Sequence, residues 1–129
     1  MATWNDVKNF LKNSHDAKEV YNGDGVSLEI EYTDGRSQMV IVQKWEVKGI
    51  EWVDIKSPIG TLSPGNINTA MEFINTTACG GIVKAGDTHA VRHCMPIADL
   101  SNDELLAPLS SVAQSADIIE EKLIGGDNL

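Results

Sequence analysis

The chain has 129 residues, of which 42% are hydrophobic and 22% charged, so it is neither a disordered nor a collagen-like polypeptide. Its 10 basic and 19 acidic side chains give a formal net charge of −9. Because there is no surplus of Lys or Arg to neutralise phosphate groups, binding to nucleic acid or to an anionic membrane is disfavoured. The length predicts a single domain over residues 1–129, and the lack of a long apolar run or a signal-peptide pattern predicts a cytoplasmic protein.

The first predicted element is a short helix over residues 3–13. Apolar residues recur there at helical spacing, and Thr3 can cap the first turn. The polar stretch that follows, residues 14–25, ends in a run of Asn, Gly and Asp, which is typical of a turn.

Three strands of an antiparallel meander are expected next. The first, residues 26–33, alternates apolar and polar residues, so one of its faces is buried and the other is wet. The second, residues 36–47, is apolar on both sides in its middle, as expected of a central strand that is covered on both faces. The third runs over residues 50–56, and two-residue turns that end in Gly join the three strands.

A helix and a second hairpin follow this meander. The helix is predicted over residues 64–74, because Ser63 can cap it and Pro64 suits its first position. Residues 79–85 and 88–97 predict the hairpin.

The last predicted helix is long and acidic. Ser101 and Glu104 form a capping box, and a Gly-Gly pair predicts the end of the helix, so residues 124–129 are expected to be a frayed tail. The helix carries a heptad-like apolar seam. Its members are Leu105, Leu109, Val112, Ala116, Ile119 and Leu123.

These elements predict an α+β fold in the order α-β-β-β-α-β-β-α, with an antiparallel five-strand sheet packed with helices. The predicted core combines the buried positions of the strands with those of the helices. It consists of Leu28, Ile30, Ile41, Trp52, Ile67, Met71, Leu109, Val112 and Ile119.

Two cysteines and two histidines are the candidates for a metal or redox site: Cys79, His89, His93 and Cys94. His89 and His93 share one face of a strand that rises about 3.3 Å per residue, so they lie too far apart for one ion. If Gly86-Asp87 is a two-residue turn, Cys79 lies opposite Cys94, but two free thiols are expected because there is no secretory signal. No P-loop, nucleophile elbow or H-E-x-x-H motif is present. The sequence therefore predicts no catalytic residues, no metal and no cofactor.

Apolar residues offer the other candidate site. The favoured interpretation is a sheet packed between helices, and the alternative is an exposed hydrophobic face that binds a partner chain or builds a dimer. The apolar seam of the last helix can likewise either pack on the chain's own sheet or bind a partner chain. Trp52 is both a predicted core residue and a candidate partner-binding residue, and only one of these two roles can be its main one. The candidate partner-binding residues are Trp45, Trp52, Leu105, Leu106 and Leu123.

Three stretches carry a resemblance to a known family: TWNDVKNFLKN, VSLEIEYTDGRSQMVIVQ and LAPLSSVAQSADIIEEKLIGGDNL. With the predicted order of elements, a mass of 14.0 kDa and a pI near 4.6, the chain resembles class I type III secretion chaperones of the CesT-like fold. More specifically, it is similar to the YbjN-type family of bacterial proteins. The resemblance implies a cytosolic, non-enzymatic and often dimeric protein that binds protein segments. YbjN-type proteins are described as sensory-transduction regulators.

Three functions are therefore open at this point. The first is a protein-binding module, either chaperone-like or regulatory, that binds another polypeptide and forms a homodimer. The second is a small-ligand-binding sensory regulator that uses a cavity between the sheet and the helices. The third is a metal or redox site at the four Cys and His residues.

Overall fold

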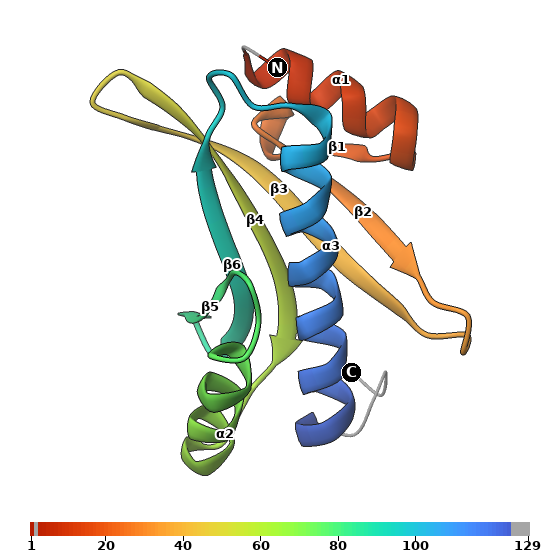
Figure 1. Ribbon diagram of the computed structural model, residues 1–129, viewed down its shortest axis with the longest axis vertical. Helices are drawn as coiled ribbons and strands as arrows, with labels where there is room; N and C mark the ends of the chain where they lie inside the picture. The colour runs from red at the N-terminus through yellow and green to blue at the C-terminus, as the bar shows by residue number, and fades with distance from the viewer. Residues whose placement is uncertain (2, 125–129) are drawn as a thin grey trace.

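An open antiparallel sheet of six strands, in the order β1-β2-β3-β4-β6-β5, combines with three helices in an α+β fold (Figure 1). The computed structural model describes residue 1 and residues 3–124. The elements are α1 (Trp4–His15), β1 (Lys18–Val20), the 3-10 turn η1 (Tyr21–Gly23), β2 (Gly25–Glu31), β3 (Ser37–Val47), β4 (Ile50–Gly60), α2 (Pro64–Ile74), β5 (Gly81–Ala85), β6 (Thr88–Pro96), α3 (Asn102–Ile119) and the π-helical turn η2 (Glu120–Ile124). Apart from Ile124, the predicted frayed tail lies outside the described residues.

The helices are placed so that one face of the sheet is covered. In Figure 1, α3 crosses in front of the central strands, and it contacts β3, β4 and β6. Helix α1 contacts β2, and α2 packs beside β5 at the end of the sheet. Within the described part of the chain, no helix is both long and apolar enough to cross a membrane.

The helix boundaries agree closely with the sequence pattern. Thr3 caps α1, and its capping box with Asp6 has both hydrogen bonds in place. Ser63 caps α2, with a Pro in the first turn. The predicted capping box of Ser101 and Glu104 is confirmed at the start of α3. Side chains at these positions satisfy backbone N–H groups that have no partner within the helix.

The prediction of five strands was wrong, because β1 lies in the stretch that was assigned to a turn. Lys18–Val20 pairs with Gly25–Ser27 of β2. The tight connection is possible because Tyr21 and Asn22 adopt left-handed backbone conformations, with φ of 55° at both residues. A strand of three residues is too short to show a period-two pattern, and most of this one is exposed and polar.

Strand β4 is longer than predicted and continues to Gly60. It passes through Pro58, which lies beyond the predicted end of this strand at residue 56. The register of β4 and β6 shifts between Pro58 and Gly60, and such a bulge tolerates the missing N–H of a proline.

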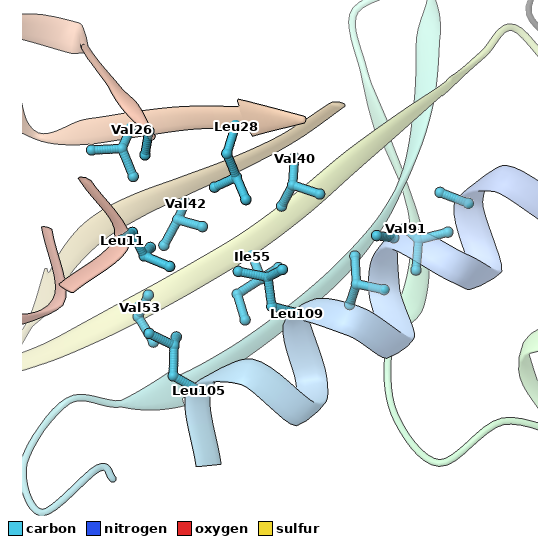
Figure 2. Close-up of a cluster of buried hydrophobic side chains, with 14 of the residues drawn as sticks. Leu11, Val26, Leu28, Val40, Val42, Val53, Ile55, Val91, Leu105 and Leu109 are labelled. Atoms are coloured by element: carbon cyan, nitrogen blue, oxygen red, sulfur yellow. The ribbon is translucent and has the colours of Figure 1, made fainter. Parts of the chain in front are cut away.

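The core lies between the sheet and the helices (Figure 2). Leu105 and Leu109 of α3 face Val53 and Ile55 of β4, and each of these side chains is at most 2% exposed. Burying a side chain of this size stabilises a fold by about 1.5–3 kcal/mol. The core is therefore held mainly by α3 on the central strands.

Most of the predicted core residues pack in the core, with three exceptions. Leu28, Leu109, Val112 and Ile119 are buried, and Ile30 and Ile67 are half-buried against the core. Trp52 is half-buried but lies on the opposite face of the sheet from the core residues Val53 and Ile55, so its assignment to the core was wrong. Met71 is 55% exposed, so its assignment to the core was wrong. Ile41 was also misassigned, because the side chains of its neighbours Val40 and Val42 point into the core and its own side chain lies on the opposite face, only half-buried.

The expectation of a central strand covered on both faces was therefore wrong. Val40 and Val42 of β3 are fully buried, whereas Met39 and Trp45 are 42% and 45% exposed. We refer to the face of the sheet that carries Met39, Ile41 and Trp45 as the open face.

Candidate functional site

Four large apolar side chains gather on the open face at the tip of the β3–β4 hairpin. The register places Trp45 opposite Trp52 and Val47 opposite Ile50, so the four form two adjacent cross-strand pairs. Trp45, Val47 and Ile50 are 45%, 53% and 52% exposed, and Trp52 is half-buried. We call these four residues the aromatic patch. Exposed apolar side chains are common singly, whereas these four are contiguous, which makes the cluster a candidate site.

The hairpin that carries the patch is defined by its turn. Lys48 and Gly49 have φ values of 52° and 79°, which fit the two-residue turns whose twist matches that of antiparallel strands. The pairing of β4 with β6 ends at Trp52 and Pro96, so the tip continues past the end of β6. Figure 1 shows this hairpin, in yellow, extending beyond the other strands.

A buried carboxylate fixes the position of Trp45. Asp54 lies on the open face of β4 and is only 1% exposed. Its Oδ2 accepts a hydrogen bond from the indole Nε1 of Trp45 (2.8 Å) and another from Nε of Arg92 (3.0 Å). Since a buried charge is costly unless it is paired, this arrangement ties the indole, the carboxylate and the guanidinium together.

A small apolar pocket of about 230 Å³ opens beside the patch. It is lined by Trp45, Val47, Trp52, Arg92 and Cys94. Burial raises the pKa of the Cys94 thiol, and the nearby Asp54 carboxylate adds to this effect, so the thiol is protonated at neutral pH. The hydrogen bond with Asp54 raises the pKa of Arg92, which remains a cation.

The structure brings together two of the five predicted partner-binding residues. Trp45 and Trp52 lie side by side on the open face. Leu105 is fully buried under α3, so a partner cannot reach it in this fold and its expected role is corrected to that of a core residue. Leu106 and Leu123 are half-buried on the helical side of the molecule, away from the two Trp residues.

Sequence reasoning missed the remaining residues of the site. Val47 and Ile50 could have been found, because a two-residue turn at Lys48-Gly49 puts them opposite one another. Asp54 and Arg92 could not, since their contact depends on the pairing of β4 with β6, strands that are distant in sequence.

The Cys and His residues do not converge on one point. The predicted register of the second hairpin is confirmed, with Ala85 opposite Thr88, but β5 begins only at Gly81, after Cys79. Both cysteines are free thiols. His89 is buried and accepts a hydrogen bond at Nδ1 from the backbone N–H of Leu62 (3.1 Å). Within residues 3–124, no group of three His, Cys, Asp or Glu side chains is arranged to hold a metal ion.

A second cavity, of about 380 Å³, lies between the β2–β3 turn and α3. Arg36 lines this cavity, and its guanidinium forms ion pairs with Asp117 and Glu121. The hydroxyl of Tyr32 is buried at its edge without a hydrogen-bond partner among the described residues. This cavity has a strongly charged lining, in contrast to the apolar pocket on the open face.

No family model matches this sequence, and no curated protein is significantly similar to it. The chemistry of the candidate site therefore follows from its own residues. The open face supplies an aromatic surface, a pocket of the size of a side chain and a guanidinium held in place by a buried carboxylate.

Proposed function

We propose that this chain is a non-enzymatic protein-binding module, chaperone-like or regulatory, that binds a partner polypeptide through the open face of its sheet. The observation that carries this proposal is the aromatic patch, whose Trp45, Val47 and Ile50 are each about half exposed. Trp is among the side chains that contribute most to binding energy in protein interfaces. The hydrogen bond from Trp45 to Asp54 supports the proposal further, because a side chain held in place loses less conformational entropy when it binds.

The order of elements supports a chaperone-like assignment of the fold. Without the short strand β1, the chain follows α-β-β-β-α-β-β-α, the arrangement of the CesT-like chaperones. We propose on this basis that it is a YbjN-type protein with that fold and that it acts in the cytoplasm, where its two thiols remain reduced. A homodimer is part of the same proposal, since an exposed apolar face can bury itself against a second copy.

Binding of peptides tests this function. The purified chain is incubated with an array of peptides of varied hydrophobicity, and its own association is measured by sedimentation velocity. A Val47→Ser/Ile50→Ser variant removes the aliphatic half of the patch, and Glu46→Gln is the matched control at the same hairpin tip. We expect the native chain and the control to bind apolar peptides or to self-associate, and the patch variant to do neither. A native chain that binds no peptide and stays monomeric at high concentration would contradict the proposal.

A small-ligand sensor is the second candidate function, because the Arg36 cavity lies between the sheet and α3 and its volume falls in the range of small-molecule sites, about 300–1,000 Å³. A thermal-shift screen of small polar compounds tests it, with an Arg36→Gln variant to localise any effect. A compound that stabilises the native chain but not the variant would favour the sensor over the protein-binding module.

A further inference from the structure

The apolar pocket on the open face is smaller than most small-molecule sites. Its volume of about 230 Å³ is below the range of about 300–1,000 Å³ that small-molecule sites occupy. Its walls are the rings of Trp45 and Trp52, with Val47 and Cys94 completing the apolar lining. A pocket of this size and chemistry suits one large apolar side chain of a polypeptide.

The charges beside the pocket are unlike those of the chain as a whole. Lys56 and Arg92 lie directly opposite each other on β4 and β6, and like charges in this position repel. Asp54 forms an ion pair with Arg92 through Nε. Among the described residues Lys56 has no ion pair of its own. A chain with a net charge of −9 thus has two adjacent cations on its open face, and one of them, Arg92, lines the apolar pocket and pairs with the buried carboxylate of Asp54.

We propose that the pocket receives a large apolar side chain from an extended segment of another polypeptide, and that an acidic residue next to this side chain pairs with Lys56 and Arg92. The inference rests on the proposed function and adds the chemistry of the bound segment. An incoming carboxylate would relieve the repulsion between the two cations, whereas an incoming Lys or Arg would increase it. Charge therefore selects among segments that the apolar pocket alone would not distinguish.

Three short peptides test this selection by fluorescence anisotropy. The first has a Phe flanked by Asp on both sides, the second has the same Phe flanked by Lys, and the third has Ala in place of Phe with the Asp residues kept. We expect the Asp-flanked Phe peptide to bind roughly tenfold more tightly than the Lys-flanked one and to lose this advantage as salt screens the charges. The Ala peptide should bind weakly, because it does not fill the pocket.

Two charge variants separate the local effect from the effect of net charge. Lys56→Glu should reverse the preference between the Asp- and Lys-flanked peptides, because it replaces one of the two cations with an anion. Lys84→Glu makes the same change in net charge at an exposed position of β5 that does not line the pocket, and it should leave the preference intact.

The two thiols report where the peptide binds. Cys94 lines the pocket, whereas Cys79 lies beside α2 and β5. A bound Asp-flanked Phe peptide should slow alkylation of Cys94 severalfold and leave that of Cys79 unchanged, as measured by mass spectrometry of each labelled cysteine. Unchanged alkylation of Cys94 at saturating peptide would overturn the proposed position.

The outcomes distinguish this inference from the proposed function. If the Lys-flanked peptide binds equally well or better, and the patch variant still abolishes binding, the protein-binding function stands and the acidic specificity is wrong. If none of the three peptides binds while the native chain self-associates through the patch, the acidic specificity is again wrong. If no peptide binds and no association occurs, both proposals fail.

Discussion

Both faces of the sheet carry large apolar side chains along β3 and β4, but the two faces have different neighbours. On the face under the helices, Val42, Val53 and Ile55 are fully buried. On the open face, Trp45 and Ile50 are about half exposed and contact one another's strands rather than a helix. Hydrophobic content alone therefore does not decide which residues form the core. The placement of α1 and α3 decides it, and this leaves part of the second face exposed.

The two faces also differ in their buried polar groups. The covered face is closed by apolar side chains from α3, with Leu105 and Leu109 over the central strands. The open face buries a carboxylate, Asp54, and holds it with the indole of Trp45 and the guanidinium of Arg92. Polar contacts of this kind contribute less to stability than apolar burial but orient the groups that form them.

The largest effect is expected from a cavity on the covered face. Leu109→Ala removes a side chain that is 2% exposed, and such a change costs about 2–5 kcal/mol of the free energy of unfolding. Urea denaturation of the native chain and the variant measures this difference. A loss below about 1 kcal/mol, the size of an ordinary surface substitution or little more, would mean that α3 does not cover the sheet as described.

Alanine substitutions at two glycines, one near the core and one in the open hairpin, test how tightly each region is packed. A Cβ atom at Gly80 would lie 3.2 Å from Val91 in the core, whereas one at Gly49 in the open hairpin would meet nothing within 4 Å. Both residues have positive φ, so Ala at either costs about 1–2 kcal/mol in backbone strain, and crowding adds about 1–3 kcal/mol at Gly80. Urea denaturation should therefore rank Gly80→Ala as the more destabilised variant. Equal losses of unfolding free energy in the two variants would show that the core around Val91 accommodates the added methyl group without destabilisation.

A smaller loss is expected from the polar contact of the open face. Asp54→Asn keeps the shape of the side chain and an oxygen that accepts hydrogen bonds, but it removes the charge that pairs with Arg92, so the loss should be about 1–1.5 kcal/mol, the difference between charged and neutral hydrogen bonds. The emission of single-Trp variants that retain Trp45 should also change, because the indole loses a charged acceptor. Unchanged stability and emission would mean that Asp54 does not hold the patch in place.

The smallest effect concerns pH and the start of α3. Hydrogen bonds from the backbone and side chain of Ser101 lower the pKa of Glu104 below its value in the unfolded chain, about 4.3. This contribution to stability is present above that value and is lost as the pH falls through the lower pKa of the folded state. Glu104→Gln should flatten the decline of the unfolding free energy with acidification, and Asp103→Asn is the matched control that removes another carboxylate from the same turn. Parallel pH profiles for the native chain and Glu104→Gln would contradict this role of the capping box.

The sequence was sufficient for features that depend on local patterns. Capping residues such as Thr3, Ser63 and Ser101 placed the helices, and the turn at Lys48-Gly49 set the register of the β3–β4 hairpin. These signals are readable because each is contained within a few neighbouring residues.

Features that depend on distant parts of the chain were not predicted. The apolar middle of β3 is compatible with one or with two covered faces, and only the packing of α3 distinguishes them, so Ile41 was placed in the core and the extent of the open face was missed. Leu105 and Trp45 look equally apolar in the sequence, yet one is buried and the other exposed. The contact of Asp54 with Arg92 likewise depends on two strands 38 positions apart in the sequence.

One measurement tests most directly whether the covered face stabilises the fold while the open face binds a partner. The free energy of unfolding and the affinity for the Asp-flanked Phe peptide are determined on the same preparations of the native chain and the Val47→Ser/Ile50→Ser variant. If the open face serves binding rather than folding, the variant should remain within about 0.5 kcal/mol of the native stability per substitution, as exposed positions usually do, and should bind the peptide at least roughly tenfold more weakly. A variant that is strongly destabilised but binds the peptide as the native chain does would contradict this account.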